Sequence, residues 1–282
     1  MNLKSKAMMP LQVLAILIAL AGLVMFFLSD RAVGWLGVFL ASGALPVYLS
    51  AFVSLGKTAR TSAKLPAVQV FAAIGLVFAI WPAVSKPSSV NPSIYLPLSL
   101  ALIGYLAMQW YVFVYSRYGR NPGKVIVVGK PLPDASFTNL DGASVSIGEL
   151  SGSKALLVFY RGNWCPLCMA QLSELRERAD ALAEVQVKFI SNQSAAQSRE
   201  LADKLDLPGH MELLMDPDLE AAKAWGVADL GGTPLGMLGY PTDTVMATVI
   251  ALDEQGRVIF GDETDNYRVR PHPDAFMPVL TG

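Results

Sequence analysis

The chain has 282 residues, of which 53% are hydrophobic, a share too large for a wholly water-soluble protein. Its net charge of -1 is unevenly divided: residues 1–124 hold ten Lys or Arg and one acid, whereas residues 125–282 hold twelve and twenty-two. Neither part carries a basic stripe with interleaved aromatics, which excludes a nucleic-acid binder. Two cysteines exclude a disulfide-rich scaffold. The composition predicts a membrane part joined to an acidic soluble part.

Four stretches without a charged residue open the chain: Ala7–Ser29, Ala32–Gly56, Leu65–Ser85 and Pro87–Ser116. Each is long enough to cross a bilayer, since roughly 20 apolar residues in a helix span its hydrocarbon core. They predict four transmembrane helices, with Pro46 and Pro97 kinking the second and fourth. Six aromatic residues near the span ends are expected at the membrane interface: Trp35, Trp81, Trp110, Tyr111, Tyr115 and Tyr118.

The spans contain no Cys, His, Asp, Glu, Lys or Arg, so they lack the groups of a proton relay, a haem site or a thiol relay. An anchor is the favoured interpretation, with an apolar lipid or quinone pocket as the alternative. Cations set the orientation. Eight flank one side (Lys4, Lys6, Lys57, Arg60, Lys64, Arg117, Arg120, Lys124) and two the other (Arg31, Lys86). Both termini are therefore predicted to be cytoplasmic, in an integral protein of a bacterial inner membrane.

Three segments are predicted: a four-helix transmembrane domain at 1–118, a Gly- and Pro-rich linker at 119–133, and a soluble domain at 134–282. Hairpins are expected at 135–147 and 245–260, and strands at 154–160, 185–191 and 212–215. Helices are expected at 167–182, 195–205 and 274–280, with another opened by Asp216 as cap and Pro217 at its first position. This order predicts an α/β sheet with helices on both faces.

Trp164-Cys165-Pro166-Leu167-Cys168 lies where the strand ending at Tyr160 turns into a helix. A helix start stabilises a thiolate through its free N–H groups and its dipole, and a spacing of three brings the second sulfur within reach of a disulfide. Pro166 suits the first helical turn, and Arg161 adds a nearby positive charge. The pattern predicts a redox-active dithiol.

Two other interpretations of this cysteine pair remain open. A structural zinc site would need two further ligands, but His210 and His272 are isolated in the sequence. An inert buried pair or a purely structural disulfide is the second alternative, although structural disulfides are rare in the cytosol. We expect no metal and no bound cofactor.

The run from Phe159 to Cys168, Phe-Tyr-Arg-Gly-Asn-Trp-Cys-Pro-Leu-Cys, resembles the peroxiredoxin-like branch of the alkyl hydroperoxide reductase and thiol-specific antioxidant (AhpC/TSA) family. The resemblance covers residues 130–282, including the segments 216–218, 225–227 and 265–273. It implies a thioredoxin fold and a thiol oxidoreductase with antioxidant activity, which acts on a peroxide or disulfide and is reduced by a thiol protein or small thiol.

The family pattern also assigns site residues, and two registers disagree. In the peroxiredoxin register, Arg161 stands in the proline position, Cys165 in the threonine position and Cys168 in that of the attacking cysteine. The thioredoxin register names Cys165 instead. The family's usual cis-proline or arginine falls near Met246 or Ala247, so Arg161 and Arg270 are nominated as the arginines of the site, with Tyr267 beside Arg270 in the family-like tail.

The position of Cys165 at the helix start predicts that it has the lower pKa and attacks, while the deeper Cys168 resolves. The leading hypothesis is a membrane-anchored thiol redox enzyme that cycles through a Cys165–Cys168 disulfide, with Trp164 and Pro166 framing the site. One alternative is a redox sensor or partner-docking module without turnover. Another is an exported disulfide reductase, if the topology is inverted.

Overall fold

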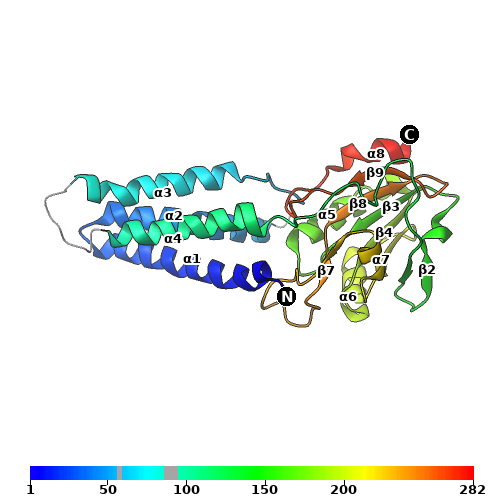
Figure 1. Ribbon diagram of the computed structural model, residues 1–282, viewed down its shortest axis with the longest axis horizontal. Coiled ribbons are helices and arrows are strands. Elements are labelled where there is room, and N and C mark those ends of the chain that lie inside the picture. Colours follow the sequence, from blue (N-terminus) through cyan, green and yellow to red (C-terminus); the bar gives the residue numbers. More distant parts are fainter. Residues whose placement is uncertain (56–58, 86–94) are drawn as a thin grey trace. The chain divides into compact units, whose positions relative to one another are not determined.

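The computed structural model describes residues 1–55, 59–85 and 95–282 (Figure 1). The chain forms two compact units. The helical unit comprises Leu3–Gly56 and Ser62–Ser116, and the C-terminal unit comprises Met1–Asn2, Lys57–Thr61 and Arg117–Gly282. The C-terminal unit is thus assembled from three separate stretches of the chain.

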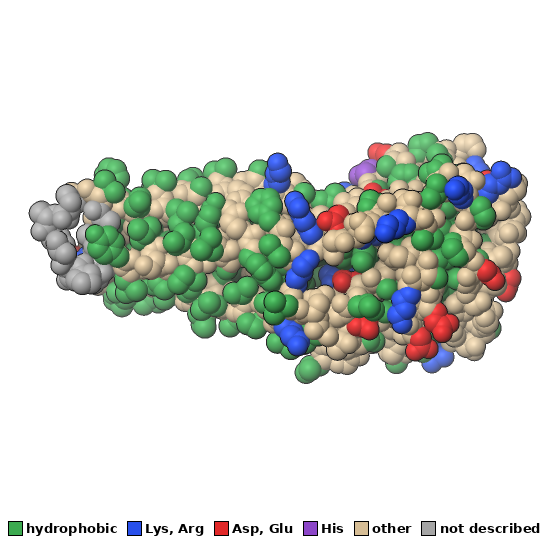
Figure 2. Space-filling view, viewed as in Figure 1, with side chains coloured by type: hydrophobic (Ala, Val, Ile, Leu, Met, Phe, Trp, Pro, Cys, Tyr) green, Lys and Arg blue, Asp and Glu red, His purple; other side chains and the backbone are tan. Residues whose placement is uncertain are grey.

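The helical unit contains α1 (Leu3–Leu28), α2 (Ala32–Leu55), α3 (Pro66–Ser85) and α4 (Leu96–Trp110), which continues as the π-helical turn η2 (Tyr111–Tyr115). Among the residues that the structure describes, three helical stretches are long and apolar enough to cross a membrane: 3–28, 32–52 and 96–115. The helix at 66–82 is apolar but shorter. Residues 87–94 of the fourth predicted span lie outside the described residues. Apolar side chains gather over the surface of these helices (Figure 2).

Glycines bring the helix backbones of this unit into direct contact. A Cβ on Gly37 in α2 would lie 2.3 Å from the backbone nitrogen of Ala79 in α3, and one on Gly75 in α3 would lie 2.4 Å from that of Ala41 in α2. Small residues that allow such close approach are typical of helix pairs in membranes. The α2–α3 pair is therefore held by packing that no larger side chain can reproduce.

Three details of the helical prediction are wrong. Pro97 occupies the first turn of α4, where its missing N–H costs nothing, instead of a kink inside a span. Trp35, Tyr111 and Tyr115 are buried, so these three do not form an exposed aromatic belt. Tyr118 belongs to the C-terminal unit, where its hydroxyl accepts a hydrogen bond of 2.9 Å from the Ala247 amide. Tertiary contacts decide the place of these rings.

The C-terminal unit is built on a seven-stranded sheet of order β2-β1-β5-β4-β3-β8-β9. Its strands are β1 (Ser136–Thr138), β2 (Ser144–Ser146), β3 (Ala155–Phe159), β4 (Gln186–Ser191), β5 (Met211–Met215), β8 (Thr248–Leu252) and β9 (Val258–Asp262). The central β3, β4 and β5 are parallel, whereas β8 runs antiparallel to β3. A separate pair joins β6 (Ala228–Asp229) to β7 (Thr244–Val245).

Helices follow the parallel strands: α5 (Pro166–Arg176) after β3, α6 (Ala195–Leu205) after β4, α7 (Glu220–Ala224) after β5, and α8 (Met277–Thr281) at the end. Short 3-10 turns lie at η3 (Ile147–Leu150), η4 (Asp180–Leu182) and η5 (Pro273–Ala275). Alternate β3 residues, including Leu157, pack with Trp225 and α7 in one core cluster, and the residues between them, such as Leu156, are fully buried too. The strand predicted at 154–160 is thus confirmed, and both of its faces are buried.

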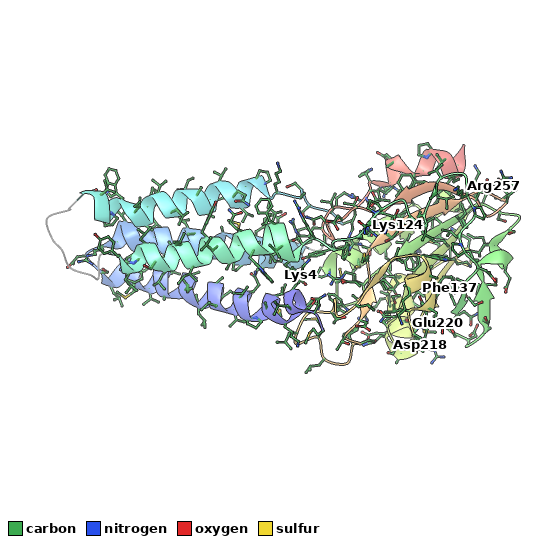
Figure 3. All side chains as sticks on the ribbon, viewed as in Figure 1. Lys4, Lys124, Phe137, Asp218, Glu220 and Arg257 are labelled. Atoms are coloured by element: carbon green, nitrogen blue, oxygen red, sulfur yellow. The ribbon has the colours of Figure 1, made fainter. Side chains whose placement is uncertain are left out.

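Boundaries differ from the predictions where a turn intervenes. Asp216 is not the N-cap residue of α7, because the helix begins at Glu220 after Leu219 at φ 57°. The Asp216 carboxylate still accepts a 2.8 Å hydrogen bond from the Ala222 amide in the first turn. Glu220 marks the start of the helix in Figure 3. The helix expected at 167–182 divides into α5 and η4. The strand expected at 245–252 divides as well, because Val245 pairs with Ala228 in the small sheet.

Residues 119–133, the predicted linker, lie along the C-terminal unit. Gly129 donates to the Val258 carbonyl at 2.8 Å, and Ile126 and Leu132 join the core cluster around Trp225. The carboxylate of Asp265 accepts from the Gly119 and Arg120 amides at 2.6 and 3.1 Å. The Asp265 side chain therefore satisfies two backbone N–H groups of this segment.

Candidate active site

The candidate site is the turn between β3 and α5. Fully buried Tyr160 follows β3, and Gly162 then adopts φ 138°, where a Cβ would lie 2.6 Å from the indole nitrogen of Trp164. Only glycine fits this conformation and this contact. Cys165 is the N-cap residue of α5 and Pro166 occupies its first turn. The sequence Arg-Gly-Asn-Trp-Cys-Pro therefore turns the chain sharply and begins the helix at the first sulfur.

Both cysteines are reduced and buried, with 2% of Cys165 and none of Cys168 exposed. Two donors point at the Cys168 sulfur: the Arg161 backbone amide at 3.4 Å and the Arg270 Nη2 at 3.3 Å. The same Nη2 lies 3.8 Å from the Cys165 sulfur. Arg270 comes from the C-terminal tail, so residues about a hundred positions apart form the sulfur pocket.

The donors around the two sulfurs make them electrostatically unequal. Burial alone raises the pKa of Cys168, but hydrogen bonding from the Cys165 thiol, the Arg270 charge and the Arg161 amide together lower that pKa well below its ordinary value. Burial raises the pKa of Cys165, and its hydrogen bond to Cys168 and the negative charge there raise it further. These contacts favour the thiolate at Cys168 and the thiol at Cys165.

This assignment reverses the expectation that the helix start gives Cys165 the lower pKa. The N-cap position of Cys165 is as predicted, yet no side-chain capping hydrogen bond is made there. Direct contact with Arg270 and the Arg161 amide outweighs the dipole, because charge-assisted hydrogen bonds act at contact distance. The electrostatics agree with the peroxiredoxin register.

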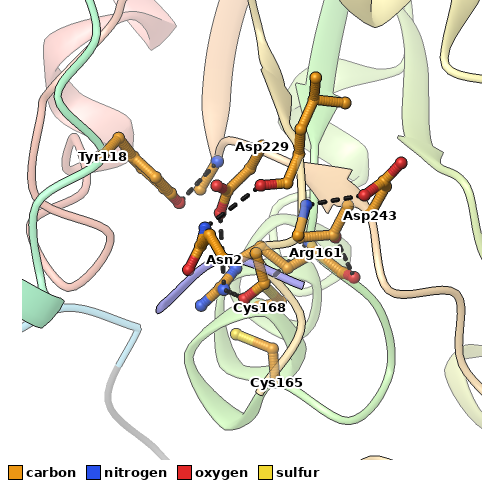
Figure 4. A network of polar contacts seen from close by, with 12 residues as sticks. Asn2, Tyr118, Arg161, Cys165, Cys168, Asp229 and Asp243 are labelled. Atoms are coloured by element: carbon orange, nitrogen blue, oxygen red, sulfur yellow. Dashed lines mark hydrogen bonds and ion pairs between the residues drawn. The ribbon is translucent and has the colours of Figure 1, made fainter. Parts of the chain in front are cut away.

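The Arg161 side chain serves a different purpose from its amide (Figure 4). Its Nη2 donates to the Gly232 carbonyl at 2.8 Å and lies 3.7 Å from the Asp229 carboxylate. The guanidinium carbon also lies 4.9 Å from the Trp164 ring centroid and 5.1 Å from that of Tyr267. Arg161 thus fixes Trp164 and Tyr267 around the turn, while Arg270 supplies the charge at the sulfurs.

Sequence reasoning missed Gln171 and Tyr118. The Gln171 Oε1 accepts a 2.6 Å hydrogen bond from the Arg270 Nη1 and so orients the guanidinium toward the sulfurs. Its position three residues after Cys168 is a signal that helical spacing could have supplied. Burial raises the pKa of Tyr118 to about 12, although the charges of Arg161 and Arg270 oppose the shift. No pattern in the sequence marks Tyr118 as a neighbour of the site.

Segments from elsewhere in the chain also contact the site region. Arg60 forms a paired ion contact with Glu174 on α5, the helix that Cys165 precedes and that contains Cys168. The Thr61 amide donates a hydrogen bond to the Arg268 carbonyl at 2.8 Å, and the Thr61 hydroxyl accepts one from the Arg268 guanidinium at 2.9 Å. Both α5 and the tail that carries Arg270 are therefore held by residues 60–61.

Within residues 1–55, 59–85 and 95–282, no three His, Cys, Asp or Glu side chains gather closely enough to hold a metal ion. His210 and His272 lie apart from the cysteines: His210 precedes β5, and the His272 ring pairs with Asp274 at 3.2 Å. Nothing in this part of the chain favours the zinc interpretation.

The sequence of the C-terminal unit matches known proteins. Residues 128–260 match the sequence profile of the AhpC/TSA family. The thioredoxin-like protein YneN of Bacillus subtilis is 35% identical over 115 residues, which cover 39% of this chain and 64% of that protein. The chloroplastic peroxiredoxin Q of Triticum aestivum is 33% identical over 124 residues, covering 43% of this chain and 56% of the relative. The chain thus spans less than two thirds of either relative.

A solved structure resembles the same part of the chain. Reduced Prx3 from Vibrio vulnificus, in complex with hydrogen peroxide, aligns with 55% of this chain and 99% of its own, with a TM-score of 0.48 and 20% identity. The resemblance read from Phe159–Cys168 is confirmed by the match to residues 128–260. Over residues 128–260, the thioredoxin-like α/β domain of this chain thus matches the AhpC/TSA family and is similar to peroxiredoxin and thioredoxin-like proteins.

Proposed function

We propose that the C-terminal unit reduces peroxides, with Cys168 as the attacking thiolate and Cys165 as the resolving thiol. The observation that carries this proposal is the convergence of the Arg270 Nη2 and the Arg161 amide on the Cys168 sulfur, at 3.3 and 3.4 Å. A nearby cation keeps the thiol in its thiolate form, which is the nucleophile. The same cation can stabilise the negative charge on the oxygen that leaves.

The reaction has two steps at the protein. The Cys168 thiolate attacks the terminal oxygen of the hydroperoxide, the O–O bond breaks, and the alkoxide leaves beside Arg270 and takes a proton from solvent. The resulting Cys168 sulfenic acid is attacked by the Cys165 sulfur, which releases water and forms the Cys165–Cys168 disulfide. A thiol protein or small thiol then reduces the disulfide. Peroxide is reduced, thiol is oxidised, and the cycle needs no bound cofactor.

We further propose that residues 1–118 anchor this domain in a bilayer and that residues 134–282 form the redox domain, joined by residues 119–133. Helices long and apolar enough to cross a membrane, packed through Gly37 and Gly75, support the anchor. The eight cations on one side of the spans favour cytoplasmic termini in an inner membrane. A tag after Gly282 should then resist protease added to spheroplasts, in which the outer face of the inner membrane is exposed. Digestion of the tag would show the opposite topology.

Single cysteine variants of the full chain in nanodiscs test the redox assignment. We expect Cys168→Ser to lose peroxide consumption with dithiothreitol as reductant, because its thiolate is gone. Cys165→Ser should still form a sulfenic acid that dimedone traps, since the attacking sulfur and its donors remain.

The opposite pattern would contradict the proposal. If Cys168→Ser forms the trapped sulfenic acid and Cys165→Ser does not, the thioredoxin register holds and disulfide reduction becomes the function to test. A wild-type chain that forms the disulfide once but consumes no further peroxide with reductant present would be a redox sensor, not an enzyme.

A further inference from the structure

The loop between β6 and β7, residues 230–243, carries a second feature of this domain. From Leu230 to Thr242 it contains no charged residue, and three of its leucines are exposed: Leu230 by 58%, Leu235 by 42% and Leu238 by 89%. Single exposed leucines are common, but three on one uncharged loop form an apolar patch that water alone does not favour. We call Leu230, Leu235 and Leu238 the leucine patch.

The base of this loop is firmly held. The Gly231 amide donates to the Asp243 carboxylate at 2.7 Å, and the Thr233 amide donates to the Thr242 carbonyl at 3.1 Å. Farther along, the Gly239 carbonyl accepts from the Gln197 side chain at 3.0 Å. The loop that carries the leucine patch is therefore held in place by hydrogen bonds at its base and near Gly239.

The loop also begins beside the amino terminus (Figure 4). The Asn2 amide donates to the Gly231 carbonyl at 3.0 Å, and the Asn2 side chain donates to the Leu230 carbonyl at 3.2 Å. Asn2 immediately precedes Leu3, the first residue of the 26-residue apolar helix α1. If α1 enters a bilayer, the span that begins at Ala7 starts five residues after Asn2, roughly 8 Å along a helix, so the start of the loop lies close to the lipid headgroups.

We propose that the leucine patch inserts into the lipid headgroup and acyl boundary and forms a second membrane contact of this chain. The inference rests on the proposed anchoring by α1. Lipid is the favoured occupant because residues 230–242 carry no charge that could form ion pairs with a protein partner. In addition, Lys4 and Lys6 follow Asn2 in the sequence and suit anionic headgroups. Tyr240, which donates to the Asn163 side chain in the active-site turn, ties the inserted loop to the site.

The test uses the full chain with Cys165→Ser and Cys168→Ser, which removes both native thiols, and one new cysteine labelled with the fluorophore NBD. The probe position is Leu238→Cys. Val13→Cys, half exposed on α1, reports helix insertion, and Gln255→Cys, exposed in the β8–β9 turn, reports water. Each protein is placed in phosphatidylcholine and phosphatidylglycerol vesicles with or without brominated acyl chains. Circular dichroism and thermal unfolding check that each labelled protein is folded.

We expect brominated lipid to quench most of the fluorescence at positions 13 and 238 and to leave position 255 unchanged. Quenching at 13 but not at 238 would overturn the loop contact while the anchor stands. An emission at 238 that is blue-shifted yet unquenched would show that protein covers the patch, either a partner or a second copy, and would equally overturn it. If position 13 is unquenched as well, the anchoring proposal fails, and the loop contact fails with it.

Discussion

The two units use buried polarity in opposite ways. In the helical unit, contacts between helices depend on missing side chains, as at Gly37 against Ala79, and the amides of Gln69 and Gln109 supply a polar link between α3 and α4. In the C-terminal unit, Arg161, Arg268 and Arg270 are all buried, at exposures of 5%, 1% and 5%. Burying a charge is costly unless partners satisfy it. The helical unit therefore depends on close packing of its helix backbones, while the C-terminal unit buries charged side chains beside the two cysteines.

The largest effect should come from removing the buried charge at the sulfurs. Arg270→Ala is expected to lower the second-order rate of peroxide reduction by about 10² to 10³, the usual cost of losing one donor to a developing anion. Stopped-flow kinetics on the full chain would measure it. Arg257→Ala, at an exposed position in the β8–β9 hairpin, is the control and should leave the rate unchanged. Equal rates in both variants would remove Arg270 from the mechanism.

The unequal sulfurs should separate by pH. In Cys165→Ser, where the serine hydroxyl can still donate to Cys168, alkylation by iodoacetamide should remain fast below pH 8.5, because the lowered pKa keeps Cys168 a thiolate there. The rate should fall only as the pH drops through that lowered pKa. In Cys168→Ser, burial, the largest cause of the raised pKa of Cys165, remains and should confine fast alkylation to alkaline pH. Superimposable pH profiles would contradict the asymmetry.

In the helical unit, shape should matter where charge does not. Gly37→Ala places a Cβ 2.3 Å from the Ala79 nitrogen and should destabilise the helices by about 1–3 kcal/mol, as overpacking does. Gly43→Ala is the matched control, since its Cβ would meet Ala19 at an ordinary 3.4 Å. Thermal unfolding in nanodiscs compares them, with peroxide reduction at low temperature unchanged in both. An equal Tm for the two variants would refute the packing argument.

The smallest effect should come from Gln171, a positioning residue that acts through Arg270. Gln171→Ala is expected to slow peroxide reduction about tenfold, one hydrogen bond to a charged group being worth about 1.5–3 kcal/mol at most. It should also raise the pH at which Cys168 alkylates, a change that simple destabilisation does not produce. Gln171→Glu keeps an acceptor for Arg270 and should restore much of the rate. A rate loss without the pH change would make the role purely structural.

Much of this arrangement could be predicted from local sequence. Continuous apolar runs identify β3 and β4, and helical spacing identifies α6, because their burial is set by neighbours along the chain. The position of Cys165 before Pro166 likewise places the dithiol at a strand–helix turn. The start of α7 was harder to predict from the sequence. Asp216-Pro217 is a typical helix start, but the chain forms a turn there and the helix begins at Glu220.

The electrostatics of the site could not be predicted in this way. The lower pKa of Cys168 depends on Arg270, about a hundred residues distant, and on a backbone amide whose direction only the turn at Gly162 determines. The sequence nominated Arg270 from the family-like tail but could not say which sulfur it approaches. Tyr118, expected at a membrane interface, lies near both site arginines for the same reason: tertiary contacts override local pattern.

The contacts of Asn2, Arg60 and Thr61 bear on whether residues 119–282 alone would keep the structure of the C-terminal unit. A protein that begins at residue 119 would retain the sheet and both cysteines. However, α5 would lose its ion pair with Arg60, and the tail that carries Arg270 would lose both hydrogen bonds between Arg268 and Thr61. The loop between β6 and β7 would also lose its hydrogen bond from Asn2. Residues 1–2, 57–61 and 117–282 together form this unit, and the helical stretches Leu3–Gly56 and Ser62–Ser116 lie between them along the chain. The unit is therefore complete only when residues on both sides of the apolar helices are present.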